Sequence, residues 1–215
     1  MLPASVPGAA GFDVAAGSMS GEAGPANTVW DAFPFGDGRT AFLVMEVKAP
    51  GHPPAHLLGM ARAALRAAAD GRGLAEVLAR ANGALAGVHT EGIDQFVDCA
   101  VVLPGEGTIE WSAAGKVPAG ILGREGTFQE LGSHGPPLGM LDGFRYGTEQ
   151  ATMGSGSSLL ALAGGSMGLF RGAADLVAEV QGKTAGEVVG TVHRAVRRAH
   201  PDGSREVSVL FLRKH

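Results

Sequence analysis

The spacing of apolar residues changes repeatedly along the chain, between the two-residue period of strands and the three- and four-residue period of helices. Strand-like runs fill residues 11–47, and two helical patterns follow up to residue 88. Strand patterns return from 95 to 163, and two more helical patterns precede a last apolar run at 205–213. Because strands and helices come in blocks rather than in strict alternation, we predict an α+β fold of two antiparallel sheets flanked by helices.

Glycine-rich turns delimit the predicted strands. The turn GDGRT separates DAFPF from AFLVMEV and predicts a hairpin over Val29–Val47, and PGEG and GREG predict two further hairpins between residues 95 and 131. The chain has 215 residues, of which 45% are hydrophobic and 18% charged. This balance is typical of a globular protein, and we expect a single domain over residues 1–215.

Charge and apolar content exclude some classes of partner. The formal net charge is −4, and basic residues cluster only at Arg194, Arg197 and Arg198, which argues against nucleic acid. No apolar run approaches the roughly 18 residues of a membrane span, and the first residues lack a basic and apolar leader pattern. The single Cys99 lies in an apolar run and is interpreted as a core residue. We therefore expect a cytoplasmic protein with no membrane segment.

Several short segments, in this order, carry a family resemblance. They are TVWD at 28–31, MEVKAPG at 45–51 followed by HPPAHLLG, SAAGKVPAGIL with GPPLGML, LLALAGGSMG at 159–168, and REVSVLFLR at 205–213. This order resembles the PPM (protein phosphatase 2C) class of metal-dependent serine/threonine phosphatases. The similarity is greatest to the bacterial branch of sporulation stage II protein E and the stress-response phosphatases of partner-switching systems. The resemblance implies the PPM sandwich of two antiparallel sheets with helices outside.

The resemblance also implies a site of two Mn²⁺ or Mg²⁺ ions held by aspartates, which activate water against a phosphoester. At the corresponding positions this chain has Thr28, Glu46, Gly164 and Arg205. Magnesium and manganese require hard anionic oxygens, and only Glu46 supplies one. We therefore expect no intact catalytic residues and no metal cofactor, and interpret the domain as a regulatory, protein-binding pseudophosphatase.

Alternatives remain open at this stage. An active phosphatase using Mn²⁺ or Mg²⁺ would need acids from elsewhere, and Asp31 and Asp98 are the nearest candidates beside Glu46. A structural subunit of a larger assembly is a third possibility. The pair Lys48 and Arg205 could instead hold the phosphate of a phosphorylated partner without hydrolysing it.

Other features are given modest interpretations. His52 and His56 have a spacing found in zinc sites, but exposed histidines near a helix start are the simpler interpretation. The segment GSGSS at 154–158 is interpreted as a turn, and the arginines at 194–198 as a solvated helix face with a possible acidic partner. By resemblance, the partner would be a phosphorylated anti-sigma-factor antagonist or a kinase, and the two helices over about 53–88 would provide a homodimer contact.

Overall fold

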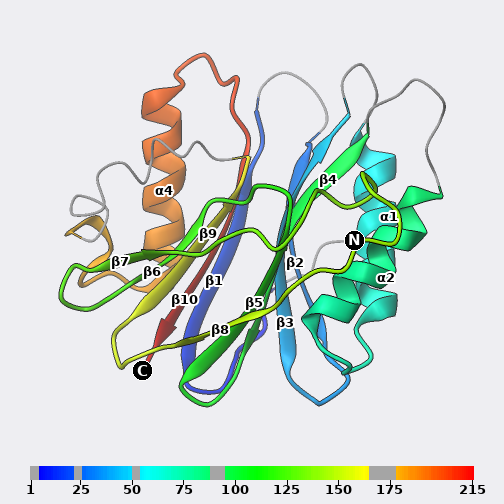
Figure 1. Ribbon diagram of the computed structural model, residues 1–215. Coiled ribbons are helices and arrows are strands. Elements are labelled where there is room, and N and C mark those ends of the chain that lie inside the picture. Colours follow the sequence, from blue (N-terminus) through cyan, green and yellow to red (C-terminus); the bar gives the residue numbers. More distant parts are fainter. Residues whose placement is uncertain (1–4, 22–25, 50–53, 88–94, 165–177) are drawn as a thin grey trace.

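In the computed structural model, two five-stranded antiparallel sheets pack face to face and helices cover both outer faces (Figure 1). The structure describes residues 5–21, 26–49, 54–87, 95–164 and 178–215. One sheet has the strand order β1-β10-β9-β6-β7, and the other has the order β2-β3-β4-β5-β8. The prediction of two antiparallel sheets flanked by helices is confirmed.

The first sheet contains β1 (Phe12–Met19), β6 (Ala119–Leu122), β7 (Phe128–Glu130), β9 (Ser158–Ala163) and β10 (Val207–Lys214). The second sheet contains β2 (Thr28–Pro34), β3 (Thr40–Lys48), β4 (Phe96–Pro104), β5 (Thr108–Ala114) and β8 (Glu149–Thr152). The helices are α1 (Pro54–Ala68), α2 (Leu74–Ala86) and α4 (Ala185–Ala199). The helix expected at 173–180 falls mostly outside the described residues, and residues 178–180 are helical.

The strand β8 is shorter than the sequence pattern over 145–153 predicts. Tyr146 is buried and donates from its hydroxyl to the carbonyl of Pro136, and the hydroxyl of Ser112 donates to the carbonyl of Gly147. These contacts fix the chain before it reaches β5, so ladder pairing begins only at Glu149. Side-chain contacts from distant segments therefore override a local strand pattern here.

Side chains along β3 point alternately into two hydrophobic cores, one on each face of the sheet. Leu43 and Met45 pack with α1 and α2, whereas Phe42 and Val44 lie between the two sheets. Glu46 continues the second series, so its side chain belongs to the inner face at one end of the sandwich. Figure 1 shows α1 and α2 on the outer side of this sheet, and α4 on the outer side of the other.

The helix α4 packs its valines on the first sheet, against Val207, Val209 and Phe211 of β10. It begins with a capping box: the Thr184 hydroxyl accepts from the backbone N–H of Glu187, and the Glu187 carboxylate accepts from the backbone N–H of Thr184. The helix ends at Ala199, and the backbone N–H of His200 donates to the carbonyl of Val196. Among the described residues, no helix combines the length and apolarity that crossing a bilayer requires.

Candidate functional site

Three of the four positions implied by the resemblance meet at one end of the sandwich. Antiparallel pairing places Thr28 of β2 opposite Glu46 of β3, and Glu46 opposite Asp98 of β4. Gly164 follows β9 in the other sheet and lies against Thr28 and the backbone of Glu206. The sheets thus bring together residues that are up to about 180 positions apart in the sequence. The fourth position, Arg205, lies just before Glu206.

A chain of hydroxyl groups occupies the centre of this site. The Ser208 hydroxyl donates to Thr28 Oγ1 over 3.1 Å, and Ser208 Oγ lies 2.6 Å from Ser18 Oγ. Thr28 is only 3% exposed and Ser208 is fully buried. Neutral hydroxyls in mutual hydrogen bonds satisfy one another and leave no anionic oxygen to attract a cation.

Gly164 has no room for a side chain. A Cβ atom at this position would lie 2.5 Å from Thr28 Cγ2 and 2.6 Å from the backbone oxygen of Glu206. Its φ of +75° also belongs to the left-handed region, which glycine adopts without steric cost. The methyl group of Thr28 occupies the space that a side chain at position 164 would need.

Two acids of the site, Glu46 and Asp98, lie near Lys48. Glu46 Oε1 lies 2.6 Å from Lys48 Nζ, and Asp98 is buried beside Glu46. Burial raises the pKa of Asp98 above its ordinary value and the charge of Glu46 adds to this, whereas the backbone N–H of Lys116 and the Lys48 ammonium lower it. A single ammonium therefore provides the positive charge next to these two acids.

Arg205 and Glu206, the two residues before β10, have different surroundings. Glu206 Oε2 accepts a hydrogen bond of 2.7 Å from the backbone N–H of Asn27, at the mouth of the site. Arg205, one residue earlier, instead lines a hollow beside α4 with Arg197 and His200. Within the described part of the chain, no contact joins Arg205 to Lys48. The two cations proposed to share a phosphate thus lie in different surroundings.

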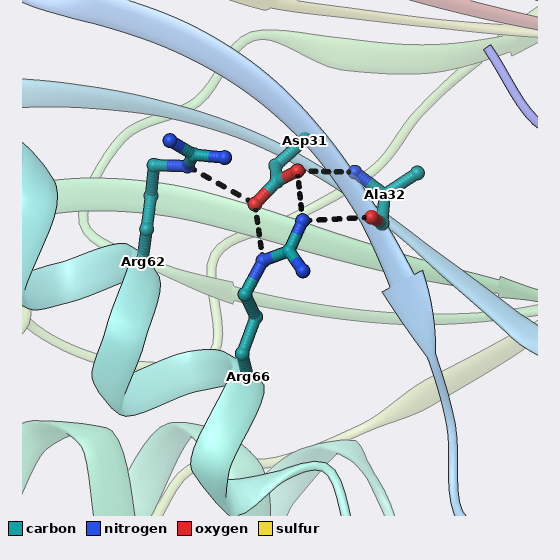
Figure 2. Close-up of polar contacts among 4 residues, drawn as sticks. All are labelled: Asp31, Ala32, Arg62 and Arg66. Carbon is teal, nitrogen blue, oxygen red and sulfur yellow. Dashed lines mark hydrogen bonds and ion pairs between the residues drawn. The ribbon is translucent and has the colours of Figure 1, made fainter. Parts of the chain in front are cut away.

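Asp31 faces away from the site, toward α1 (Figure 2). Its fully buried carboxylate accepts from Arg62 Nε at 3.0 Å and from Arg66 Nε and Nη2 at 2.8 and 2.6 Å. Burial alone would raise the pKa of Asp31, but the hydrogen bonds from Arg66 and Arg62 outweigh it and hold the pKa below its ordinary value. Asp31 is three residues from Thr28 along the strand, and this odd spacing already puts the two on opposite faces.

Other predicted features have ordinary placements. Cys99 is fully buried in β4, and burial raises the pKa of its thiol to about 12, as expected of a core cysteine. The segment 154–158 forms a turn closed by the Ser157 N–H donating to the Gly154 carbonyl. His56 is exposed on α1, and His52 lies outside the described residues.

One polar anchor was not found from the sequence. The fully buried Asn82 of α2 donates to the carbonyl of Leu141 at 2.8 Å and accepts from the N–H of Gly139 at 2.9 Å. The Tyr146 hydroxyl also lies 3.3 Å from Asn82 Oδ1. These bonds tie the segment GPPLGML to α2. An asparagine at a core-facing helical position was the available signal.

The residues at this site do not fit a two-metal centre. Two such ions need several bridging carboxylates, but Thr28 and Gly164 supply none and Glu46 is already neutralised by Lys48. Across residues 5–21, 26–49, 54–87, 95–164 and 178–215, no three His, Cys, Asp or Glu side chains are grouped to hold a metal. Asp31, the other acid considered, is bonded to two arginines.

The sandwich is that of the PPM class of serine/threonine phosphatases. Within it, a sequence model of the family described as Stage II sporulation protein E (SpoIIE) matches residues 36–202, and the chain belongs to this family. No curated protein matches the chain.

Solved structures share the fold at low sequence identity. The RsbU and RsbW domains of a Mycobacterium tuberculosis protein give a TM-score of 0.77 at 18% identity, covering 98% of this chain and 63% of that one. A serine/threonine phosphatase of S. agalactiae gives 0.77 at 13% identity, with 95% and 100% covered. The catalytic domain of the phosphatase PstP, solved with two manganese ions, gives 0.72 at 14% identity, with 94% and 97% covered.

Proposed function

We propose that this chain is a PPM-fold pseudophosphatase, a regulatory domain that binds a protein partner in bacterial signalling and does not hydrolyse phosphoesters. The observation that carries this proposal is the contact between Thr28 and Gly164. One of these positions has no charge, the other has no side chain, and the methyl group of the first fills the space at the second. By resemblance to the PPM class, both positions would carry an acidic metal ligand in an active enzyme, and neither residue here supplies an anionic oxygen.

The pairing of Glu46 with Lys48 supports the same proposal. A lysine ammonium 2.6 Å from the glutamate offsets its charge without any metal, and it repels a cation that approaches. Burial raises the pKa of the neighbouring Asp98, because a desolvated site disfavours the charged carboxylate. The charge of Glu46 is thus balanced by a protein cation, with no need of a metal ion.

By similarity to relatives that carry RsbU and RsbW domains, the pathway we propose is a partner-switching circuit in the cytoplasm. The partner would then be a phosphorylated anti-sigma-factor antagonist or a kinase. A pull-down with each of these proteins tests this, because a purely structural subunit would retain neither. We also propose a homodimer through the two helices over about 53–88, and light scattering on the purified chain tests it.

An active Mn²⁺- or Mg²⁺-dependent phosphatase is the alternative, and one observation favours it: Glu46 and Asp98 are two acids side by side at the mouth of the site. Calorimetric titration with Mn²⁺ and a p-nitrophenyl phosphate assay on the same sample separate the two functions. We expect neither binding nor turnover. Metal-dependent turnover that Glu46→Ala abolishes, but Glu130→Ala on the exposed end of β7 leaves intact, would establish the active enzyme instead.

A further inference from the structure

A hollow of about 300 Å³ lies beside the end of α4, on the side of the first sheet that faces this helix. It is formed where α4 ends, where β1 ends and where the chain turns into β10, and Figure 1 shows these three points at the same end of the sandwich. Its lining includes Met19, Ser20, Arg197, His200, Gly203 and Arg205. A volume of this size lies at the lower end of the range of small-molecule sites, about 300–1,000 Å³.

Three nitrogen-bearing side chains converge on this hollow from two segments. Arg197 and His200 are three residues apart at the end of α4, a spacing that puts both on one side of the helix. Arg205 lies in the segment before β10 and lines the hollow, whereas the next residue, Glu206, accepts a hydrogen bond from Asn27. In the part of the chain that the structure describes, neither guanidinium makes a hydrogen bond or an ion pair with a protein group.

Helix stabilisation explains only part of this arrangement. Cations in the last turn of a helix interact favourably with its dipole, which accounts for Arg197 and its neighbour Arg198. Arg205 lies outside the helix, so the dipole gives no reason for its position. Asp202 interacts with His200, and its carboxylate accepts hydrogen bonds from the N–H and hydroxyl of Ser204. Two arginines therefore share a concave surface on a chain of net charge −4 with no anion assigned to them.

We propose that this hollow is a binding site for a phosphate monoester. Two guanidiniums offer planar pairs of N–H donors that match phosphate oxygens, and the His200 imidazole and Ser20 hydroxyl add further donors. The apolar surface of Met19 gives room for the carbon chain that carries the phosphate. The ester can come from a phosphorylated protein side chain or from a small metabolite, since both present the same dianion.

This site is separate from the hydroxyl-filled one between the sheets. Ser18 and Ser208 lie on the inner face of the first sheet, whereas Met19 packs on the α4 face. Binding in the hollow therefore needs no metal and does not depend on whether the chain hydrolyses phosphoesters. Failure of one proposal leaves the other intact.

The test is an NMR titration of the full ¹⁵N-labelled chain with O-phospho-L-serine and, separately, with L-serine. We expect phosphoserine to shift the side-chain signals of Arg197 and Arg205, and serine to shift neither. Arg197→Ala and Arg205→Ala should each weaken binding about tenfold, the value of one charge-assisted hydrogen-bonding group. Both side chains are exposed and unbonded within the described residues, so thermal melting should confirm that the variants stay folded.

Arg198→Ala is the matched control, because Arg198 is a basic, exposed residue of the same turn that does not line the hollow. Its affinity for phosphoserine should equal that of the wild type. An equal loss in all three arginine variants would show a general charge effect and overturn the proposal. The proposal would also be overturned if about 20 equivalents of phosphoserine, added to protein at a concentration on the order of millimolar, shifted no signal. A phosphoserine peptide that binds more tightly than phosphoserine identifies a protein partner; equal affinities identify a small phosphate ester.

Discussion

Replacing Gly164 with alanine tests the central feature of the site. The new Cβ would lie 2.5 Å from Thr28 Cγ2 and 2.6 Å from the Glu206 carbonyl oxygen, well inside van der Waals contact. The left-handed φ of +75° adds about 1–2 kcal/mol for any residue with a Cβ. Overpacking adds about 1–3 kcal/mol, because the backbone oxygen cannot rotate away. The free energy of unfolding should therefore fall by about 2–5 kcal/mol, a large share of a typical total.

Urea unfolding followed by circular dichroism measures this loss. The variant Gly182→Ala separates the cost of the left-handed backbone from the cost of overpacking. Gly182 has nearly the same φ, +74°, but nothing within 4 Å of its Cβ position, so it should lose only the backbone share of about 1–2 kcal/mol. In a Thr28→Ser background the Cγ2 contact disappears while the hydroxyl remains, so Gly164→Ala should cost less there, by about 0.5–3 kcal/mol. Equal losses at Gly164 and Gly182 would refute the claim that the methyl group of Thr28 fills the space beside Gly164.

Three further predictions follow from the ion pairs and the helix cap. Asp31→Asn should lower the free energy of unfolding by about 2–4 kcal/mol at pH 7, less than for a sealed pair because Arg66 is 40% exposed. Since the folded pKa of Asp31 is lowered, its contribution to the free energy of unfolding is present above the unfolded pKa and is lost as the pH falls through the folded pKa. Urea unfolding between pH 7 and 2 should therefore show a smaller loss of stability on acidification in the variant than in the wild type. Lys48→Met should raise the already elevated pKa of Asp98 further, which ¹³C NMR of the carboxyl would detect, and an unchanged value would exclude the lysine as its counterion. Thr184→Ala removes the cap of α4 and should cost about 1 kcal/mol by calorimetry, while a loss near zero would show that the cap does not stabilise this helix.

The hairpin over Val29–Val47 and the two helices after it were predictable because their signals are local. A turn sequence and the alternation beside it fix the pairing of β2 with β3, and with it the meeting of Thr28 and Glu46. The strand β8 was predicted too long, since contacts of Tyr146 with distant residues decide where pairing begins. Such contacts leave no mark in the sequence around them.

The site was less predictable than the fold. Matching segments indicated which positions would meet, but not that the methyl of Thr28 would fill the place beside Gly164. Nor did they show that Lys48 would turn to Glu46 while Arg205 turned to α4. Arg205 lines the hollow beside α4 while the adjacent Glu206 contacts Asn27, so a shift of one position in the matched segment changes which of the two is assigned to the site.

The ion pairs of Asp31 with Arg62 and Arg66 limit how α1 can move. A single ion pair lets a helix pivot about one point, but Arg62 and Arg66 are spaced by about one turn and grip the same carboxylate. Two attachments fix both the axial position of α1 and its rotational phase, and the bond from Arg66 to the Ala32 carbonyl adds a third. The helix is therefore joined to β2 by three contacts. A protein that docks on the exposed side of α1, where His56 lies, would bind to the helix that is bonded to the strand carrying Thr28.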